Sequence, residues 1–320
     1  LPAAAAEPSR KVVTTQNGDY FGFDLRTEQN VSLEQCGDIC VGDTACKAFT
    51  YNPKVKWCFL KSDYNQLNTF PGAIAGKVVQ PQVTQADIGA PPRLKFLSDQ
   101  LLQDARNTKA NLTLADDQQG MGVNTLIDMA RGQAGMGNIE NALKAFQGAL
   151  AINPDDAELW LEAARTANRI TNNSSVSIQA AIAAINGYEL TRTTESRAHA
   201  LAVMAKSLEG AENFRAALNA YKASLELVKA KSVEVAYLDL KQRKGFRVVE
   251  HTIDSDAATP RACVQFSEQL LKSGADYASF VTVNGSAPKA LEAKGDQICI
   301  EGLSHGERYK LTLRTGLPST

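Results

Sequence analysis

The sequence predicts a multidomain α+β protein: a small disulfide-stapled helix-plus-hairpin module, an α-helical repeat region and a C-terminal antiparallel β-sandwich. Three observations favour this fold class. Four of the six cysteines lie within 23 residues near the N-terminus. A central region is rich in helix-forming residues that recur at fixed offsets. The final stretch changes to short runs of alternating polar and apolar residues, the period of strands.

The composition narrows the possible functions. The 34 Lys and Arg residues balance 35 Asp and Glu residues, and a net charge of -1 argues against nucleic-acid binding. No run approaches the ~18 apolar residues of a membrane span. The Ala-rich start, 1–6, is typical of residues around a signal-peptidase site, and equally of a floppy tail or a cloning remnant. Because a strong strand pattern stops just before the C-terminus, we expect the chain to be part of a longer protein.

The chain divides into five expected segments. They are a flexible tail over 1–10, the small module over 11–80, a linker over 81–93, a helical region over 94–243 and the β-sandwich over 244–320. Pro and Gly punctuate the linker, which predicts little regular structure there.

A short helix is expected to carry the first two cysteines of the small module. Ser32 and Gln35 have the spacing of a capping box, which marks a helix start. Cys36 and Cys40 are four residues apart and therefore lie on the same helix face.

Two apolar runs follow, and they predict a hairpin. Cys46 precedes the run 48–52, Cys58 lies within the run 57–60, and a turn-like Asn-Pro-Lys separates them. Four cysteines allow three pairings. We favour Cys36–Cys58, which would tie the helix to the second strand, and Cys40–Cys46, which would close the helix-to-strand turn.

A zinc site is the alternative interpretation of these cysteines. Their spacings of three, five and eleven intervening residues lack the CxxC pairs that zinc prefers, and no His lies nearby. Disulfides therefore remain the favoured interpretation. They imply an oxidising compartment, periplasmic or extracellular.

The string CGDICVGDTACKAFTYNPKVKWCFLK resembles a PAN/apple module in its minimal four-cysteine form. The resemblance covers about residues 11–80. It implies a module that binds protein or carbohydrate and is not an enzyme. The cysteines only staple such a fold, so the ligand stays open.

The clearest unit of the helical region is 123–156. After Gly137 in a turn, it carries small, aromatic, small and Pro residues at the offsets of the second half of a tetratricopeptide repeat: Ala142, Phe146, Ala149 and Pro154. Trp160, Ala163 and Ala164 take first-helix positions in the next unit. A later unit repeats the scheme with Leu201, Met204, Ala205, Leu208, Ala217, Tyr221 and Ser224.

The repeats are not evenly spaced. Ala142 and Ala217 are 75 residues apart rather than two periods of 34, so we expect an irregular, degenerate unit over about 172–194. A plain helical bundle is the alternative. Stacked helix pairs would form a concave protein-docking surface, or only a spacer between domains.

Several short strands are expected after residue 244. They are 246–253, 262–267, 280–283, 297–301 and 309–314, with a hairpin signal at Asn284-Gly285. Cys263 and Cys299 both fall on the polar sides of their strands, which favours a third disulfide, Cys263–Cys299. A nucleophilic cysteine would need a basic partner, and neither has one adjacent in sequence.

This region resembles the first macroglobulin-like β domain of bacterial alpha-2-macroglobulins, in PRACVQFSEQL, FVTVNG and QICIEGLSHGERYKLTLRTGLPS. Some members also share the order apple-like module, helical repeats, β domain. The resemblance implies a large periplasmic or envelope protease inhibitor, whose thioester CxEQ motif and bait region are absent from this chain. It also suggests a cell-wall penicillin-binding protein as a partner.

No pattern indicates catalysis, a cofactor or a metal. The three His residues are far apart in sequence, and no GxSxG, HExxH or P-loop motif occurs. We therefore expect a non-catalytic, periplasmic or secreted segment. It would position partners, including target proteases, for a protease inhibitor, with a possible glycan at the apple module. A stand-alone envelope adaptor is the main alternative, and a cell-wall hydrolase is a third.

Overall fold

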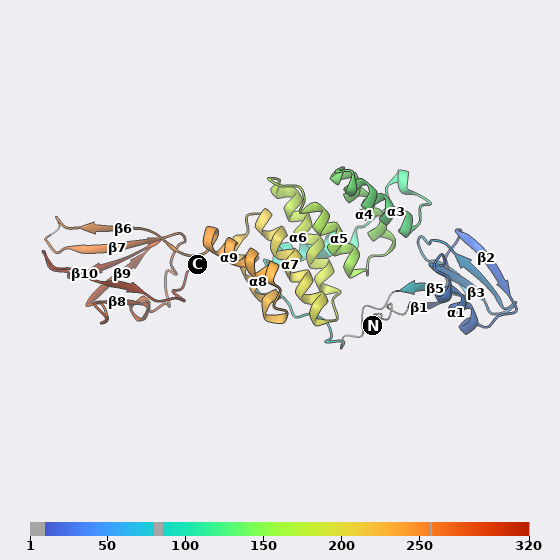
Figure 1. Cartoon of the computed structure of the whole chain (residues 1–320), viewed down its shortest axis with the longest axis horizontal. Helices are drawn as coiled ribbons and strands as arrows, with labels where there is room; N and C mark the ends of the chain where they lie inside the picture. The colour runs from blue at the N-terminus through green and yellow to red at the C-terminus, as the bar shows by residue number, and fades with distance from the viewer. Residues whose placement is uncertain (1–9, 80–85, 257, 320) are drawn as a thin grey trace, which may run out of the picture. The chain divides into compact units, whose positions relative to one another are not determined.

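The chain folds into two compact units, one ending at Tyr237 and the other beginning at Leu238. The computed structural model describes residues 10–79, 86–256 and 258–319 (Figure 1). The expected tail before Arg10 and residues 81–85 of the expected linker lie outside the described residues.

The N-terminal module, residues 11–79, is a five-stranded antiparallel sheet with one helix. Its elements are β1 (Lys11–Asp19), β2 (Asp24–Gln29), α1 (Leu33–Gly42), β3 (Ala48–Asn52), β4 (Trp57–Lys61) and β5 (Asn68–Val79). The strand order is β1-β5-β3-β4-β2, so the expected hairpin of β3 and β4 lies inside the sheet. The capping box is present, since the Gln35 N–H donates to the Ser32 side chain and the Ser32 N–H to Gln35.

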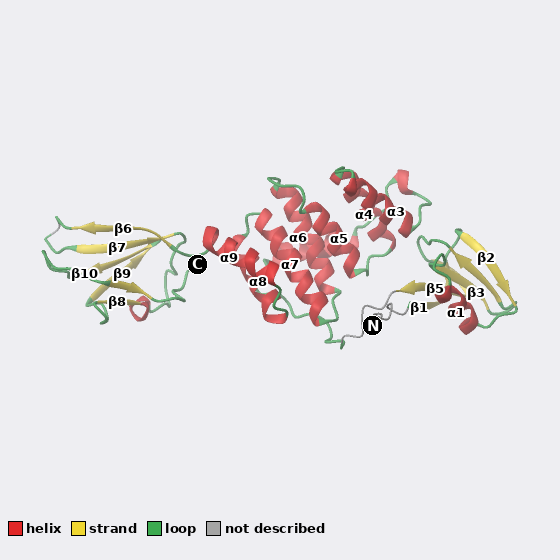
Figure 2. Ribbon diagram, in the orientation of Figure 1, coloured by secondary structure: helices red, strands yellow, loops and turns green. Residues whose placement is uncertain are grey.

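The first unit continues as a stack of helices (Figure 2). Its elements are α2 (Asp99–Ala110), the 3-10 turn η1 (Asp116–Gln118), α3 (Val123–Gly135), α4 (Ile139–Ile152), α5 (Ala157–Ala167), α6 (Ser174–Glu189), α7 (Thr194–Gly210) and α8 (Phe214–Leu227). α9 (Lys231–Lys244) follows, and it ends close to the expected boundary at 243. Gly137 adopts a φ of 85° in the turn between α3 and α4, a conformation that favours glycine.

The segment 172–194, which the uneven repeat spacing marks as a degenerate unit, is helical. That stretch contains α6, a regular 16-residue helix, and α7 begins directly after a short connection. The extra residues between Ala142 and Ala217 are absorbed by long helices, since α7 has 17 residues. Small residues such as Ala180 and Ala184 are buried on α6, so neighbouring helices can pack closely against it.

The described half of the expected linker is held against the helices. The Arg197 guanidinium donates to the Gly89 carbonyl at 2.7 Å, and the Tyr188 hydroxyl donates to the Pro92 carbonyl at 2.9 Å. The sequence could not predict these contacts, because the acceptors are the backbone carbonyls of Gly89 and Pro92, which every residue type carries. The segment 86–93 is therefore part of the folded unit.

The C-terminal unit contains two antiparallel sheets. One has the order β6-β7-β10-β9 and the other pairs β11 with β8. The strands are β6 (Val248–Asp254), β7 (Arg261–Phe266), β8 (Val281–Val283), β9 (Ala290–Lys294), β10 (Gln297–Glu301) and β11 (Leu311–Leu313), with the turn η2 (Tyr277–Phe280) before β8. Residues from both sheets, among them Val264, Ile298 and Val281, form one apolar cluster.

The hairpin signal at Asn284-Gly285 predicts the turn but not the strand partner. Both residues have positive φ, 52° and 84°, and Val283 and Ser286 exchange backbone hydrogen bonds around them. β8 nevertheless pairs with β11, about thirty residues further on, and not with the next strand. β9, which the sequence analysis did not identify, pairs with β10 instead.

Candidate protein-docking surface

A buried carboxylate joins the N-terminal module to the helices. Asp63, 6% exposed, accepts hydrogen bonds of 2.8–3.0 Å from the N–H groups of Tyr64, Asn124 and Thr125 and from the side chains of the latter two. It thereby caps the N-terminus of α3, whose own N-cap residue, Gly122, has no side chain to do so. A Cβ at Gly122 would lie 2.2 Å from the carboxylate, so only glycine permits this approach.

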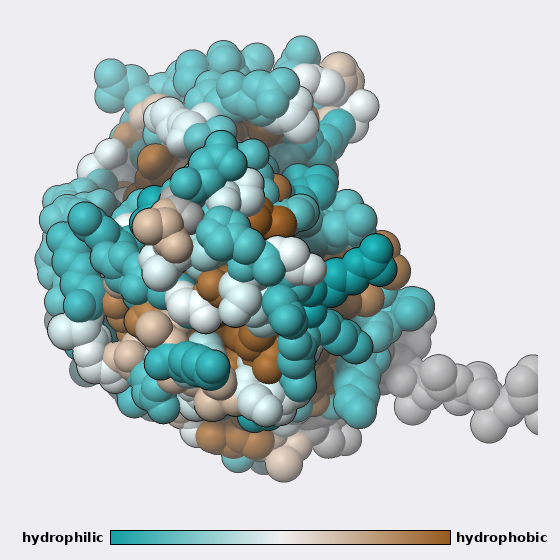
Figure 3. Space-filling model, turned by 90° about the vertical axis from the view of Figure 1, so that its left-hand side faces the viewer, coloured by the Kyte–Doolittle hydropathy of each residue, from teal (hydrophilic) through white to brown (hydrophobic). Residues whose placement is uncertain are grey.

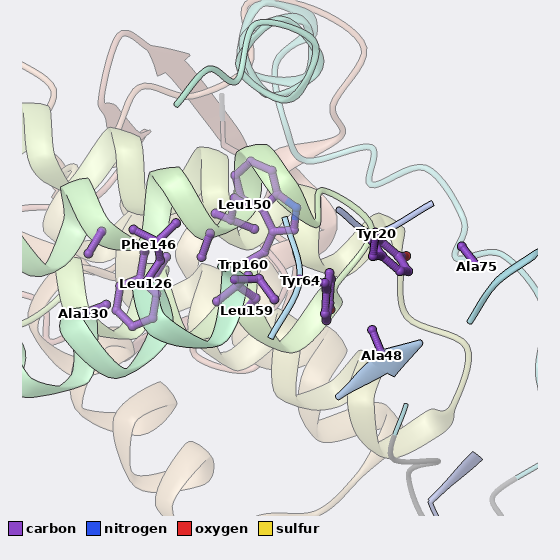
Figure 4. Packing of buried hydrophobic residues seen from close by; sticks show 14 residues of the cluster. Tyr20, Ala48, Tyr64, Ala75, Leu126, Ala130, Phe146, Leu150, Leu159 and Trp160 are labelled. Atoms are coloured by element: carbon purple, nitrogen blue, oxygen red, sulfur yellow. The ribbon is translucent and has the colours of Figure 1, made fainter. Parts of the chain in front are cut away.

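An apolar cluster continues this junction. Tyr20 and Tyr64 of the N-terminal module lie 5.1 Å apart between ring centroids, and they belong to the same buried cluster as Leu159 and Trp160 of α5. Figure 4 shows Tyr64 lying between Tyr20 and this end of the helical cluster. Burial raises the pKa of both tyrosines, so both hydroxyls stay protonated at neutral pH.

One lysine bridges the same junction. The Lys77 ammonium on β5 donates to the Asn153 side chain at 2.9 Å, at the C-terminus of α4, and lies 6.0 Å from the Tyr64 ring centre. Burial lowers the pKa of Lys77, while Asp156 and Asp155 oppose that effect. The module and the first helix pairs therefore form one packed body.

A row of paired charges crosses α3, α5 and α7, the first helices of successive helix pairs. The Arg131 guanidinium donates twice to the Glu162 carboxylate, both at 2.8 Å. Arg165 donates to Glu158 at 2.5 Å and lies 2.6 Å from Nε2 of His199. We call these five residues the charged row.

Within the charged row, His199 is the residue whose pKa is shifted toward lower values. Burial lowers its pKa, the positive charge of Arg165 lowers it further, and Glu158 opposes both effects. Since the Arg165 guanidinium can only donate, the imidazole Nε2 accepts, and its proton sits on Nδ1. His199 lies on the exposed face of α7, where its imidazole contacts Arg165.

An apolar cavity of about 590 Å³ lies elsewhere on the stack. α4, α5, α6 and the residues around the end of α2 line it, with Leu143, Trp160 and Ala180 among the walls. It is formed where α4 and α6, the second helices of neighbouring pairs, flank α5. Its walls are mainly apolar, unlike the charged row.

The sheet of the N-terminal module carries a small exposed aromatic patch. Trp57, 37% exposed, and Phe59 lie 6.2 Å apart between ring centroids on β4. In the sheet register, Gln29 and Asn52 flank Trp57, and Thr27 lies opposite Phe59. The two aromatic rings are therefore bordered by amide and hydroxyl groups. We call these five residues the aromatic patch. The Lys61 ammonium lies 6.0 Å from the centre of the Phe59 ring.

The structure places all six cysteines in disulfides. The pairs are Cys36–Cys58, Cys40–Cys46 and Cys263–Cys299, the pairs that the sequence analysis favoured. The other two histidines, His251 and His305, are exposed and belong to the second unit. In the described parts of the chain, no three His, Cys, Asp or Glu side chains are grouped as metal ligands.

None of the helices between residues 10 and 319 that are described has the length and apolar character needed to cross a bilayer. The surface seen in Figure 3 is mostly hydrophilic, with scattered apolar patches.

Asp63, Arg131 and Glu162 were missed by sequence reasoning. The α3 partners of Asp63 lie 61 and 62 residues away along the chain, and Arg131 and Glu162 are 31 residues apart, so no local pattern connects them. The one local indication of the Asp63 contact is Gly122, which directly precedes α3. A glycine at the N-cap has no side chain to cap the helix, so a carboxylate from elsewhere in the chain can do so.

Comparison with known proteins agrees with this architecture. Residues 11–83 match the PAN domain family and residues 123–166 match the tetratricopeptide repeat family. A stretch of 63 residues is 35% identical to the putative receptor protein kinase ZmPK1 of Zea mays; the match covers 20% of this chain and 8% of that protein.

Solved structures with similar helical parts include two tetratricopeptide domains. The Arabidopsis OM64 domain is 13% identical, with a TM-score of 0.33, and the match covers 38% of this chain and 94% of that one. The first such domain of Spaghetti (RPAP3), bound to an HSP90 peptide, is 14% identical, with a TM-score of 0.33, and the match covers 41% and 96%. From the family matches and the observed elements together, the chain contains a disulfide-bearing PAN domain followed by tetratricopeptide-like helical repeats.

Proposed function

We propose that this chain is a non-catalytic interaction segment that holds protein partners in a fixed relation to one another. The observation that carries this proposal is the junction at Asp63. Because the carboxylate of one module caps a helix of the next, a partner bound on the PAN domain and one bound on the repeats would keep a set distance. A flexible spacer would need no such contact.

The charged row is the proposed docking surface of the repeats. Arg131–Glu162 and Arg165–Glu158 present both signs of charge along three successive helices, which suits a partner segment that also carries both signs. Exposed pairs of this kind contribute little to folding, ~0–1 kcal/mol each, so their side chains are available to exchange partners.

Site-specific photo-crosslinking tests this surface. A photoreactive amino acid in place of Glu158 should yield one discrete protein adduct, and the same probe in place of Lys222 on α8 should yield none. The double variant Arg131→Glu with Glu162→Arg keeps the ion pair but reverses its charges, so it should remove the adduct without lowering stability. An adduct that survives the reversal would contradict docking at the charged row.

We further propose that the segment belongs to a secreted or periplasmic alpha-2-macroglobulin-like protease inhibitor. The module order and the three disulfides support this context, with target proteases and a cell-wall penicillin-binding protein as the partners. All six cysteines are paired and none precedes x-Glu-Gln, so the chain itself has no thioester residue. Incubation with proteases should therefore give no covalent adduct; capture by this chain alone would overturn the assignment.

The aromatic patch favours a second candidate function, glycan binding at the PAN domain in a stand-alone envelope adaptor. Trp57 and Phe59 offer flat apolar faces with amide groups beside them, which suits a neutral sugar ring. Trp57→Ala should weaken binding of a soluble neutral oligosaccharide by about tenfold. Val55→Ala, an exposed residue of the neighbouring turn, is the matched control. Equal affinities for both variants would rule the patch out.

A further inference from the structure

The disulfide of the C-terminal unit differs in its surroundings from the other two. Cys263 on β7 and Cys299 on β10 are directly opposite in the register, with Cα atoms 4.0 Å apart. They are 7% and 9% exposed, whereas all four cysteines of the PAN domain are 0% exposed. Only this pair retains any contact with solvent.

Both cysteines form part of the wall of a surface cavity of about 470 Å³. Thr252 on β6 and Glu292 on β9 lie directly beside them in the sheet, and both also line the cavity. A cavity of a few hundred cubic ångströms has room for a small organic molecule. A small thiol can therefore reach the disulfide without any strand being displaced.

We propose that Cys263–Cys299 is a site of reversible thiol–disulfide exchange with a small thiol from solution. The external thiolate attacks one Sγ, the Sγ–Sγ bond breaks, and the second cysteine leaves as a thiolate that takes up a proton. A second external thiolate then attacks the mixed disulfide and releases the first cysteine. In total, two external thiols become one disulfide, and the protein pair gains two electrons and two protons.

The sheet makes the exchange reversible. β7 is hydrogen-bonded to β6 and β10, and β10 to β7 and β9, so neither strand depends on the disulfide for its place. On the opposite face, Val264, Ile298 and Ile300 remain packed in the apolar cluster. After reduction, the two thiols stay opposite each other and can reoxidise.

The disulfides of the PAN domain do not offer this route. Cys36, Cys40, Cys46 and Cys58 form the core itself, together with Phe49, Tyr51 and Leu60. A thiol can reach them only when the module opens, so their reduction should follow the unfolding equilibrium of the module. Cys36–Cys58 and Cys40–Cys46 are therefore structural disulfides, and Cys263–Cys299 is the exchangeable one.

The test is limited reduction of the native chain with glutathione, followed by maleimide labelling and peptide mass spectrometry. Cys263 and Cys299 should become labelled at least about tenfold faster than any PAN-domain cysteine, because a thiol can reach the PAN-domain sulfurs only after local unfolding. Equal or faster labelling of the PAN-domain cysteines would overturn the proposal. A protein dithiol of the thioredoxin type serves as a second arm: reduction by it but not by glutathione would overturn the small-thiol assignment.

Two further measurements separate exchange from unfolding. Reduction should leave the far-ultraviolet circular dichroism unchanged, and oxidised glutathione should restore the bond; loss of the strand signal on reduction would contradict reversibility. The double variant Cys263→Ser with Cys299→Ser should fold and lose the fast-labelling class. If that variant does not fold, the labelling rates of the wild-type peptides still decide the question.

Discussion

Asp63 is the residue on which the junction between the PAN domain and the repeats depends. Asp63→Asn replaces a carboxylate that accepts five hydrogen bonds with an amide that turns two donors toward the same N–H groups. We expect a loss of about 2–3 kcal/mol in the free energy of unfolding, from the lost cap and the unpaired buried donors. Urea denaturation of the intact chain measures it.

Asp99→Asn is the matched control for this substitution. Asp99 also lies at a helix N-terminus, but it is exposed and paired only with exposed Arg93. Its loss should change the free energy of unfolding by less than about 1 kcal/mol. Equal effects for the two variants would mean that Asp63 is not a special contact.

His199 should make the stability of the repeats depend on pH. Its pKa is lower in the folded state than the ordinary value of 6.5, so the unfolded chain binds the proton more readily. Stability is therefore complete above pH 6.5 and falls as the pH drops from there toward the folded-state pKa. Protonation also removes the acceptor that Arg165 uses and places two cations together.

The measurement compares wild type with His199→Gln at pH 7.5 and pH 5.5. The variant keeps a polar side chain but cannot titrate, so the loss of stability between these pH values should be smaller in it. Equal losses in the two proteins would show that His199 is not responsible.

At the scale of elements, the helix pairs pack through glycine and alanine contacts. Gly187 on α6 faces α5, and a Cβ there would lie 2.8 Å from the Leu161 side chain and 3.1 Å from the Ala157 carbonyl. Gly187→Ala should therefore destabilise the chain by about 1–2 kcal/mol through overpacking. Thermal or urea unfolding checks this value.

Gly132 on α3 provides the opposite case. It is exposed and a Cβ there meets nothing within 4 Å. Gly132→Ala should stabilise the chain by about 0.5–1 kcal/mol through helix propensity alone. If Gly187→Ala and Gly132→Ala changed the free energy of unfolding in the same direction, packing between α5 and α6 would not explain why Gly187 must be glycine.

At the scale of the first unit, the PAN domain and the repeats should unfold together. They share one apolar cluster and the Asp63 cap, so separating them would expose Tyr20 and Tyr64 and leave the start of α3 uncapped. In a Trp160→Phe variant, Trp57 is the one remaining tryptophan and its fluorescence reports on the PAN domain. Its transition should coincide with the loss of helical circular dichroism; two separate transitions would contradict the shared core.

The sequence analysis identified the elements whose interactions are local. The capping box at Ser32, the β3–β4 hairpin and the helix pairs around Gly137 all involve residues within about one turn or one repeat of each other. The sequence analysis did not identify the strands β1, β2 and β5. β1 and β2 are largely polar, and β1 pairs with β5, which lies 49 to 68 residues later along the chain. The macroglobulin-like identity of the β unit stays a prediction.

By itself, the sequence determined the module order, the cysteine-bearing hairpin and the repeat helices, because hydrophobic period, capping residues and cysteine spacing act over a few residues. Only the tertiary structure decided the contacts that give the chain its candidate surfaces. Asp63 reaches α3, Arg165 reaches His199, and Cys263 and Cys299 line a surface cavity. Each of these depends on where the folded chain returns in space, and no local pattern of residues encodes that.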